Sequence, residues 1–145
     1  MKKLCWALVM IGLIVGASRA AGQTPPAGQA PPAPVPATPE NVATFLGIWT
    51  IEATGSYGPV SLEATLKAAA GKVTGDVSSA AQGKMTISDV TKAGSSLVFV
   101  YSFDYQGMPI TAVVTLTPAD KKVDAYIDMA GGAASFSGTA TKKAG

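Results

Sequence analysis

The sequence predicts an all-β fold: an eight-stranded, antiparallel, up-and-down β-barrel that follows a signal peptide and a disordered, proline-rich tether. Three observations lead to this prediction. Short runs of alternating apolar and polar residues fill the chain from about residue 41 onward, turn residues such as Gly separate the runs, and the runs number eight. Alternation with a period of two is typical of half-buried strands, and closing the barrel leaves no exposed sheet edge.

Residues 1–20 have the pattern of a signal peptide. Lys2 and Lys3 precede an uncharged run from Leu4 to Ala17, and Ser18-Arg19-Ala20 supplies the small residues of a cleavage site. The uncharged run is shorter than the roughly 20 residues that span a membrane, which favours cleavage after Ala20 over an uncleaved anchor. We therefore expect an exported protein, periplasmic or extracellular, with no transmembrane span after cleavage.

Cleavage would change the composition of the chain. Loss of Lys2, Lys3 and Arg19 lowers the number of basic residues from 11 to 8 against 9 acidic residues, so the formal charge moves from +2 to −1. Cys5, the only cysteine, is lost as well, which leaves no disulfide to stabilise the domain. The remaining lysines form no basic stripe, so nucleic acid is not an expected partner.

Residues 21–40 form a Pro/Ala-rich linker. The stretch from Ala21 to Pro39 holds seven of the ten prolines and has no charged or aromatic residue, so it cannot bury enough apolar surface to fold. We expect a spacer, and the alternative is a proline-rich docking ligand. Residues 41–145 then make one β-barrel domain with a single core.

The first two predicted strands are Leu46–Thr54 and Val60–Lys67. In the first, Trp49 and Ile51 share one face, and in the second apolar and polar residues alternate throughout. Ser56–Pro59 supplies the turn between them.

A third strand is expected at Lys72–Ser78 and a fourth around Met85–Ile87, which ends at Ala93-Gly94. Gly75 in the third run and Gly138 near the chain end fall on core-facing positions. Such glycines suit a sharp bend or a large side chain, such as that of Trp49, leaning across the strand.

The fifth and sixth predicted strands pair in a register that the sequence specifies. A two-residue turn at Gln106-Gly107 makes the numbers of opposed residues sum to 213. All pairs on one face are then apolar, and a shift of one residue would invert the faces. These pairs are Phe103 with Ile110, Tyr101 with Ala112, Phe99 with Val114 and Leu97 with Leu116.

Val123–Met129 fits a seventh strand, and Phe136–Ala140 fits an eighth. A helix over Pro118–Ala130 is the alternative to the seventh strand, because Thr117 followed by Pro118 resembles a helix start and Gly131 suits a helix end. A strand is favoured because Val, Tyr and Ile prefer strands.

The residue inventory excludes several kinds of chemistry. The chain has no histidine, and its one cysteine lies in the predicted signal peptide, so His-based catalysis, Cys nucleophiles and the usual zinc and haem ligands are not expected. Asp120, Asp124 and Asp128 are evenly spaced, but a solvated strand face explains them better than calcium binding or acid/base work. We therefore expect no enzyme, no cofactor and no metal site.

Two groups of side chains are candidate binding surfaces. Aromatic residues would converge inside the barrel, where eight strands enclose either a filled core or room for one small ligand. A buried Tyr101 hydroxyl needs a hydrogen-bond partner and would orient such a ligand. On the outside, apolar residues stand where alternation predicts polar ones, which favours a docking or self-association face. The inner group is Trp49, Phe99, Tyr101 and Phe103, and the outer group is Val98, Val100 and Val113.

The opening Gly47-Ile48-Trp49, followed by seven further strands, resembles the calycin group, the lipocalin-like and avidin-like barrels whose first strand carries a G-x-W element. The runs Lys72–Gly75 and Phe136–Thr139 also look like strand starts of small secreted bacterial β-barrel domains. The resemblance covers about residues 45–141. For a lipocalin-like barrel it implies an apolar ligand in the cup, held by the inner group. Avidin's biotin contacts find no match, and no basic residue closing over Trp49 is evident.

We therefore expect an exported, non-catalytic β-barrel that binds a small apolar ligand in its interior. The alternative is a structural or protein-interaction module of the cell envelope, which would hold a partner on the outer face at Val98, Val100 and Val113. An enzyme working with carboxylates and hydroxyls alone is a third possibility.

Overall fold

The structure, a computed structural model, describes residues 33–144. The predicted signal peptide and most of the predicted tether lie outside the described residues. Eight antiparallel strands, β2 to β9, follow one another around a ring, and the pairing of β9 with β2 closes it. The fold is therefore the predicted eight-stranded up-and-down barrel. The strands are β2 (Gly47–Gly55), β3 (Gly58–Ala69), β4 (Lys72–Ser79), β5 (Gly83–Ala93), β6 (Ser96–Tyr105), β7 (Met108–Ala119), β8 (Lys122–Met129) and β9 (Ala134–Lys142).

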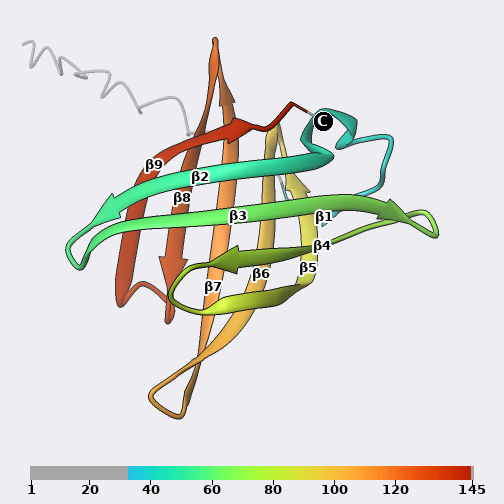
Figure 1. Cartoon of the computed structure of the whole chain (residues 1–145). Coiled ribbons are helices and arrows are strands. Elements are labelled where there is room, and N and C mark those ends of the chain that lie inside the picture. Colours follow the sequence, from blue (N-terminus) through green and yellow to red (C-terminus); the bar gives the residue numbers. More distant parts are fainter. Residues whose placement is uncertain (1–32, 145) are drawn as a thin grey trace, which may run out of the picture.

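The barrel is made of two layers that face each other across the core. Figure 1 shows β2, β3 and β4 running across β6, β7 and β8. Inward and outward residues alternate along each strand, as in β6, where Leu97, Phe99 and Tyr101 are fully buried and Val98 and Val100 are half-buried. Among residues 33–144 no charged side chain is buried. Apolar burial is therefore the main source of the domain's stability.

The hairpin of β6 and β7 has the predicted register. Leu97 pairs with Leu116 and Phe103 with Ile110. Gln106 and Gly107 form the two-residue turn with φ values of 52° and 81°, which is the pattern of a type I′ turn. The turn and the apolar faces specify the same register, and both agree with the sum of 213 that the sequence indicates.

The segment for which helix and strand were both considered is strand β8. Val123 to Met129 pair with β9 on one side, and Lys122 to Met129 pair with β7 on the other. A strand between two partners satisfies its backbone donors and acceptors in the sheet. Ala125 and Ile127 are buried, while Tyr126 between them is exposed, so the alternation with a period of two decides the structure.

Gly75 and Gly138 are needed because neighbouring backbones approach them closely. A Cβ atom at Gly138 would lie 1.8 Å from the backbone oxygen of Glu52, and one at Gly75 would lie 2.0 Å from that of Thr65. The tight neighbours are therefore the adjacent strands β2 and β3. The indole of Trp49, which the sequence offered as the large neighbour, is not among them.

The end of the proline-rich segment is attached to the barrel. Strand β1 (Val35–Pro36) pairs with Lys92 and Thr91 of β5, and the amide of Ala37 donates to the carbonyl of Val90 at 3.1 Å. Ala37 is buried. The linker predicted for residues 21–40 thus overlaps the fold from Val35 onward.

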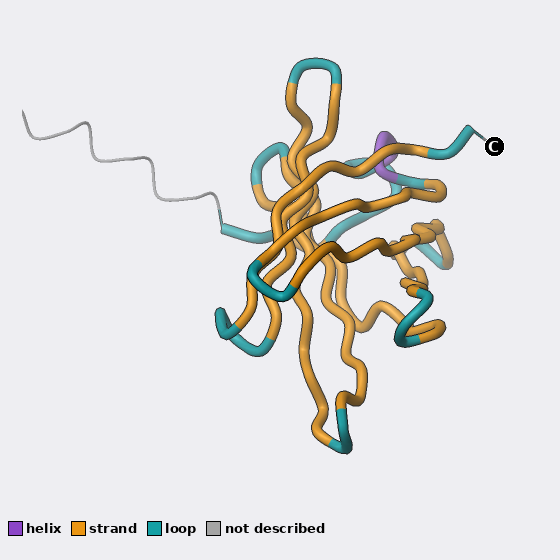
Figure 2. Tube along the Cα trace, turned by 60° about the vertical axis from the view of Figure 1, so that its left-hand side comes forward, coloured by secondary structure: helices purple, strands orange, loops and turns teal. Residues whose placement is uncertain are grey.

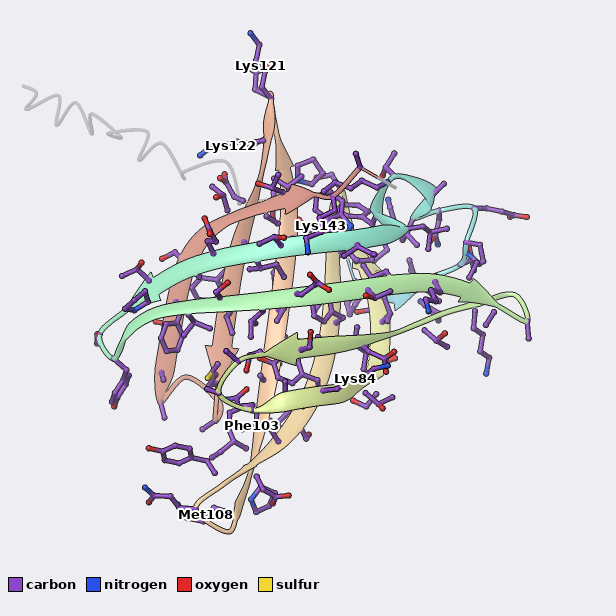
Figure 3. The ribbon with its side chains drawn as sticks, viewed as in Figure 1. Lys84, Phe103, Met108, Lys121, Lys122 and Lys143 are labelled. Atoms are coloured by element: carbon purple, nitrogen blue, oxygen red, sulfur yellow. The ribbon has the colours of Figure 1, made fainter. Side chains whose placement is uncertain are left out.

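The two ends of the barrel differ in how they are covered. At the end where β2 begins, which we call the closed end, a 3-10 helix, η1 (Ala43–Phe45), lies beside the last residues of β9 (Figures 1 and 2). At the other end, which we call the mouth, four short turns connect β2 with β3, β4 with β5, β6 with β7 and β8 with β9. Figure 3 shows Phe103 and Met108 toward the mouth and Lys121 and Lys122 at the opposite extreme.

Candidate functional site

The mouth of the barrel contains a cavity of about 720 Å³. Residues from three of the four mouth turns, those of β2–β3, β4–β5 and β8–β9, line it together with residues of the strands beneath the turns. This volume lies within the usual range for sites that hold one small molecule. The apolar lining residues include Val60, Leu62, Phe103, Ile110, Met129 and Phe136. The barrel is thus filled by side chains around Phe99 and Tyr101 and is hollow at the mouth. The interior therefore combines the two possibilities that the sequence left open, a filled core and room for a small ligand.

The four predicted inner residues lie at different depths. Phe103 lines the cavity. Tyr101 lies one inward position deeper on β6, with its ring 6.1 Å from that of Phe103, and does not line the cavity. Phe99 is fully buried below Tyr101, and Trp49 lies at the closed end. Among the predicted inner aromatics, Phe103 is the one that a molecule in the mouth would touch.

The mouth end of the barrel exposes apolar and aromatic side chains, of which Tyr57 and Tyr105 line the cavity. Tyr57 is 78% exposed, Tyr105 is 55% exposed and Met108 is 57% exposed. Tyr57 comes from the β2–β3 turn, and the other two flank the β6–β7 turn. Sequence reasoning missed these residues as a group. Two features of the sequence could have identified them. Alternate turns of an up-and-down barrel lie at the same end, and none of the four turns at this end carries a charged residue.

The β4–β5 turn contributes a polar residue, Gln82, to the lining of the cavity. The amide of Gln82 donates to the hydroxyl oxygen of Ser79 at 3.0 Å, which fixes the turn locally. The side-chain oxygen of Gln82, Oε1, is buried, and no group within the described residues donates a hydrogen bond to it. Gln82 also lines the cavity. The sequence analysis did not single out this residue.

The hydroxyl of Tyr101 is the other buried side-chain oxygen that lacks a partner among residues 33–144. Desolvation by burial raises the pKa of Tyr101 to about 12, because ionisation would place a charge in an apolar interior. The sequence analysis expected a hydrogen-bond partner for this hydroxyl, and no protein group in the described part of the chain provides one. It lies beneath the cavity, behind Phe103.

The closed end is built around Trp49. Its indole N–H donates to the carbonyl of Phe45 in η1 at 2.7 Å, and the two rings lie 6.2 Å apart. Lys142 places its Nζ 5.8 Å from the centre of the Trp49 ring and donates to the carbonyl of Thr44 at 3.3 Å. The basic residue that the sequence did not reveal is thus Lys142, at the far end of the chain.

The outer valines form a half-covered patch. Val100 pairs with Val113 across β6 and β7, and Val98 lies two residues along β6. All three are half-buried by their neighbours on the outer face, and none is among the exposed large apolar residues of the described chain. Of the six exposed large apolar residues in the described chain, three lie together at the mouth: Tyr57, Tyr105 and Met108.

The evenly spaced aspartates are engaged separately. Asp124 forms an ion pair with Lys122 at 2.8 Å, and Asp128 accepts from the amide of Gly132 at 2.7 Å. Within residues 33–144 no three side chains of the types that bind metals gather in one place. The strand face on which Asp124 and Asp128 lie is the outer one, since Ala125 and Ile127 point into the core.

Within residues 33–144, no helix combines the length and the hydrophobicity that crossing a membrane requires. Compared with known proteins, the chain matches no family model, no curated protein and no solved structure.

Proposed function

We propose that this protein is a non-catalytic binding module that holds a small, largely apolar molecule in the mouth of its barrel. The observation that carries the proposal is the cavity of about 720 Å³, which is lined mostly by apolar side chains and opens between exposed aromatic residues. Transfer of an apolar molecule from water to such a wall is favourable in proportion to the area buried. Phe103, Ile110, Met129 and Phe136 would supply most of that area.

The resemblance to lipocalin-like barrels supports the same proposal. Gly47 and Trp49 provide the G-x-W element of the first barrel strand, η1 packs against Trp49, and Lys142 covers the indole. A barrel closed at one end and open at the other is suited to holding a ligand in its cup. Export to the periplasm or the cell exterior, proposed from residues 1–20, would place this binding module outside the cytoplasm.

The alternative function, an envelope interaction module, would use Val98, Val100 and Val113. Two of these valines face each other across β6 and β7 and give the patch continuity. Their partial burial leaves less apolar surface for a partner than the mouth does. The mouth therefore supports ligand binding better than the outer face supports docking.

Filling the cavity tests the proposal. Ala134 lines the cavity from β9 and is half-buried, so the side chain in Ala134→Trp would occupy the space of a ligand. N-phenyl-1-naphthylamine, a neutral apolar dye, is titrated into the purified protein and excited directly, so that the added tryptophan does not interfere. We expect saturable dye binding to the parent protein and a loss of at least tenfold in affinity for Ala134→Trp.

Ser137→Trp is the matched control. It adds the same side chain to the same strand at an exposed outer position, and we expect its dye affinity to equal that of the parent. Thermal unfolding of both variants confirms that they are folded. The proposal fails if the dye does not bind the parent protein, or if both variants bind it as the parent does.

A further inference from the structure

The hairpin of β6 and β7 projects beyond its neighbours at the mouth. Toward the mouth, the pairing of β6 with β5 ends at Tyr101, and the pairing of β7 with β8 ends at Ala112. Residues 102–111 therefore have sheet partners only within the hairpin, and the carbonyl of Thr111 also accepts a hydrogen bond from the amide of Ala130 at 3.0 Å. Figure 1 shows this hairpin reaching past the other three turns at the mouth.

The projecting part keeps the alternation of a barrel strand although it has left the barrel. Tyr105 lies two residues after Phe103, and Met108 pairs with Tyr105, so all three lie on one face of the hairpin. We call this the inner face of the hairpin, and its four residues are apolar or aromatic: Phe103, Tyr105, Met108 and Ile110. The opposite face carries Ser102, Asp104, Pro109 and Thr111. The inner face thus has the composition of a surface that another apolar surface covers.

The protein covers the inner face less toward its tip. Phe103 and Ile110 are half-buried, whereas Tyr105 is 55% exposed and Met108 is 57% exposed. The first three of these residues line the cavity, and Met108 does not. Figure 3 shows Met108 beyond Phe103, near the end of the hairpin. The inner face is therefore a continuous extension of the cavity wall, out to a residue that the cavity itself does not reach.

From this continuity we infer that the inner face of the hairpin binds the outer part of the ligand, so that the ligand is an elongated, neutral, apolar chain and Met108 favours long chains over short ones. The inference rests on the proposed function, since the inner part of the same molecule would lie in the cavity. A chain that extends along the hairpin covers the exposed side chains of Tyr105 and Met108, and each methylene that it buries there adds to the affinity.

Two further observations fit a neutral, flexible chain. None of the residues that line the cavity is charged, so a charged group in this space would lose its hydration without gaining an opposite charge. Methionine is unbranched and polarisable, and it adapts its shape to flexible apolar molecules. A short chain or a compact ring would stay within the cavity and would not reach Met108.

Three neutral alcohols separate an elongated ligand from other apolar molecules. They are 1-octanol, a short chain, cyclododecanol, a compact ring, and 1-tetradecanol, a long chain. Each is used to displace N-phenyl-1-naphthylamine from the purified protein. We expect Met108→Ser to weaken the binding of tetradecanol about fivefold, because the chain loses apolar contact at the tip of the hairpin. The affinities for octanol and cyclododecanol should stay within twofold of the parent's.

Asp104→Ser is the matched control. It introduces the same residue on the same hairpin, but on the opposite face, and all three alcohols should bind this variant as they bind the parent. Met108 and Asp104 are both exposed, so neither substitution removes a core contact, and thermal unfolding checks that both variants are folded.

The outcomes are distinguishable. If Met108→Ser binds tetradecanol as the parent does, or weakens all three alcohols equally, the elongated ligand is refuted while binding in the cavity stands. If the parent forms dimers or binds phosphatidylcholine vesicles and Met108→Ser abolishes that association, a second copy or a lipid surface covers the inner face, and the inference is refuted. If neither the dye nor any alcohol binds the parent protein, the proposed function itself fails and the inference fails with it.

Discussion

The closed end and the mouth of this barrel are made from the same strands but differ in how they are covered. At the closed end, Trp49 is buried, its indole N–H is hydrogen-bonded to Phe45, and Lys142 covers its ring. At the mouth, Phe103 is only half-buried and borders a cavity. The comparison shows that the closed end is covered over Trp49 and keeps a smaller hollow of about 510 Å³ beside that residue, whereas the mouth retains the larger space of about 720 Å³.

The residues of the connections explain the difference. Before β2 the chain folds over the closed end, where Val42 and Phe45 are buried. The turns at the mouth consist largely of small residues, such as Ala80-Ala81 and Ala130–Ala133. Small side chains cannot fill the end of an eight-stranded barrel, whose interior is just wide enough to be filled by large ones. The mouth therefore stays open because most residues of its turns have small side chains.

Truncating one aromatic residue at each end should show the largest difference. We expect Trp49→Ala to lower the free energy of unfolding by about 3–5 kcal/mol, because it leaves a cavity in a packed region and removes the hydrogen bond to Phe45. Phe103→Ala should cost about 1 kcal/mol, because its side chain is already partly exposed, but should weaken dye binding severalfold. Urea unfolding and dye titration measure the two effects. Equal stability losses for the two variants would contradict the division between the ends.

Alkaline pH probes the region between the two ends, where Tyr101 is buried. Its pKa is about 12 in the folded protein and about 10 when exposed, so above pH 10 the unfolded state releases a proton that the folded state keeps. Stability due to this group is therefore complete below pH 10 and is lost as the pH rises from 10 to 12, by about 3 kcal/mol in total. Urea unfolding at several pH values measures the slope.

Tyr101→Phe serves as the comparison for this titration. The variant should lose less stability than the parent between pH 10 and 12. At neutral pH it should be as stable as the parent or more stable by up to about 1 kcal/mol, since it removes a buried hydroxyl that has no protein partner among residues 33–144. Parallel pH profiles for the two proteins would show that Tyr101 does not titrate as its burial requires.

The smallest expected effect concerns Lys142. Replacing it in Lys142→Met keeps most of the aliphatic contact but removes the charge over Trp49 and the hydrogen bond to Thr44, which should cost about 0.5–1 kcal/mol. Lys67→Met, an exposed lysine on β3 near the same end, should change stability by less. Trp49 fluorescence should respond to the first substitution alone. Identical behaviour of the two variants would mean that Lys142 does not contribute to the closed end.

The sequence alone predicted the strands, because the period of apolar residues and the register of β6 and β7 are local properties. Gln106-Gly107 determines the turn, and the apolar pairs around it determine which faces meet. For β8, the sequence favoured the strand correctly because a period of two fits the burial of Ala125 and Ile127. These predictions need only neighbours in the chain or across one hairpin.

The contacts between residues of distant strands, which the sequence did not predict, were determined by the closure of the barrel. Lys142 is far from Trp49 in sequence and reaches it only because β9 pairs with β2. In the same way, Gln82, Phe103 and Met129 come from three different hairpins and share a wall only because alternate turns gather at the mouth. Local alternation specifies which way a side chain points, whereas the order of strands around the ring decides which side chains meet and how much space remains between them.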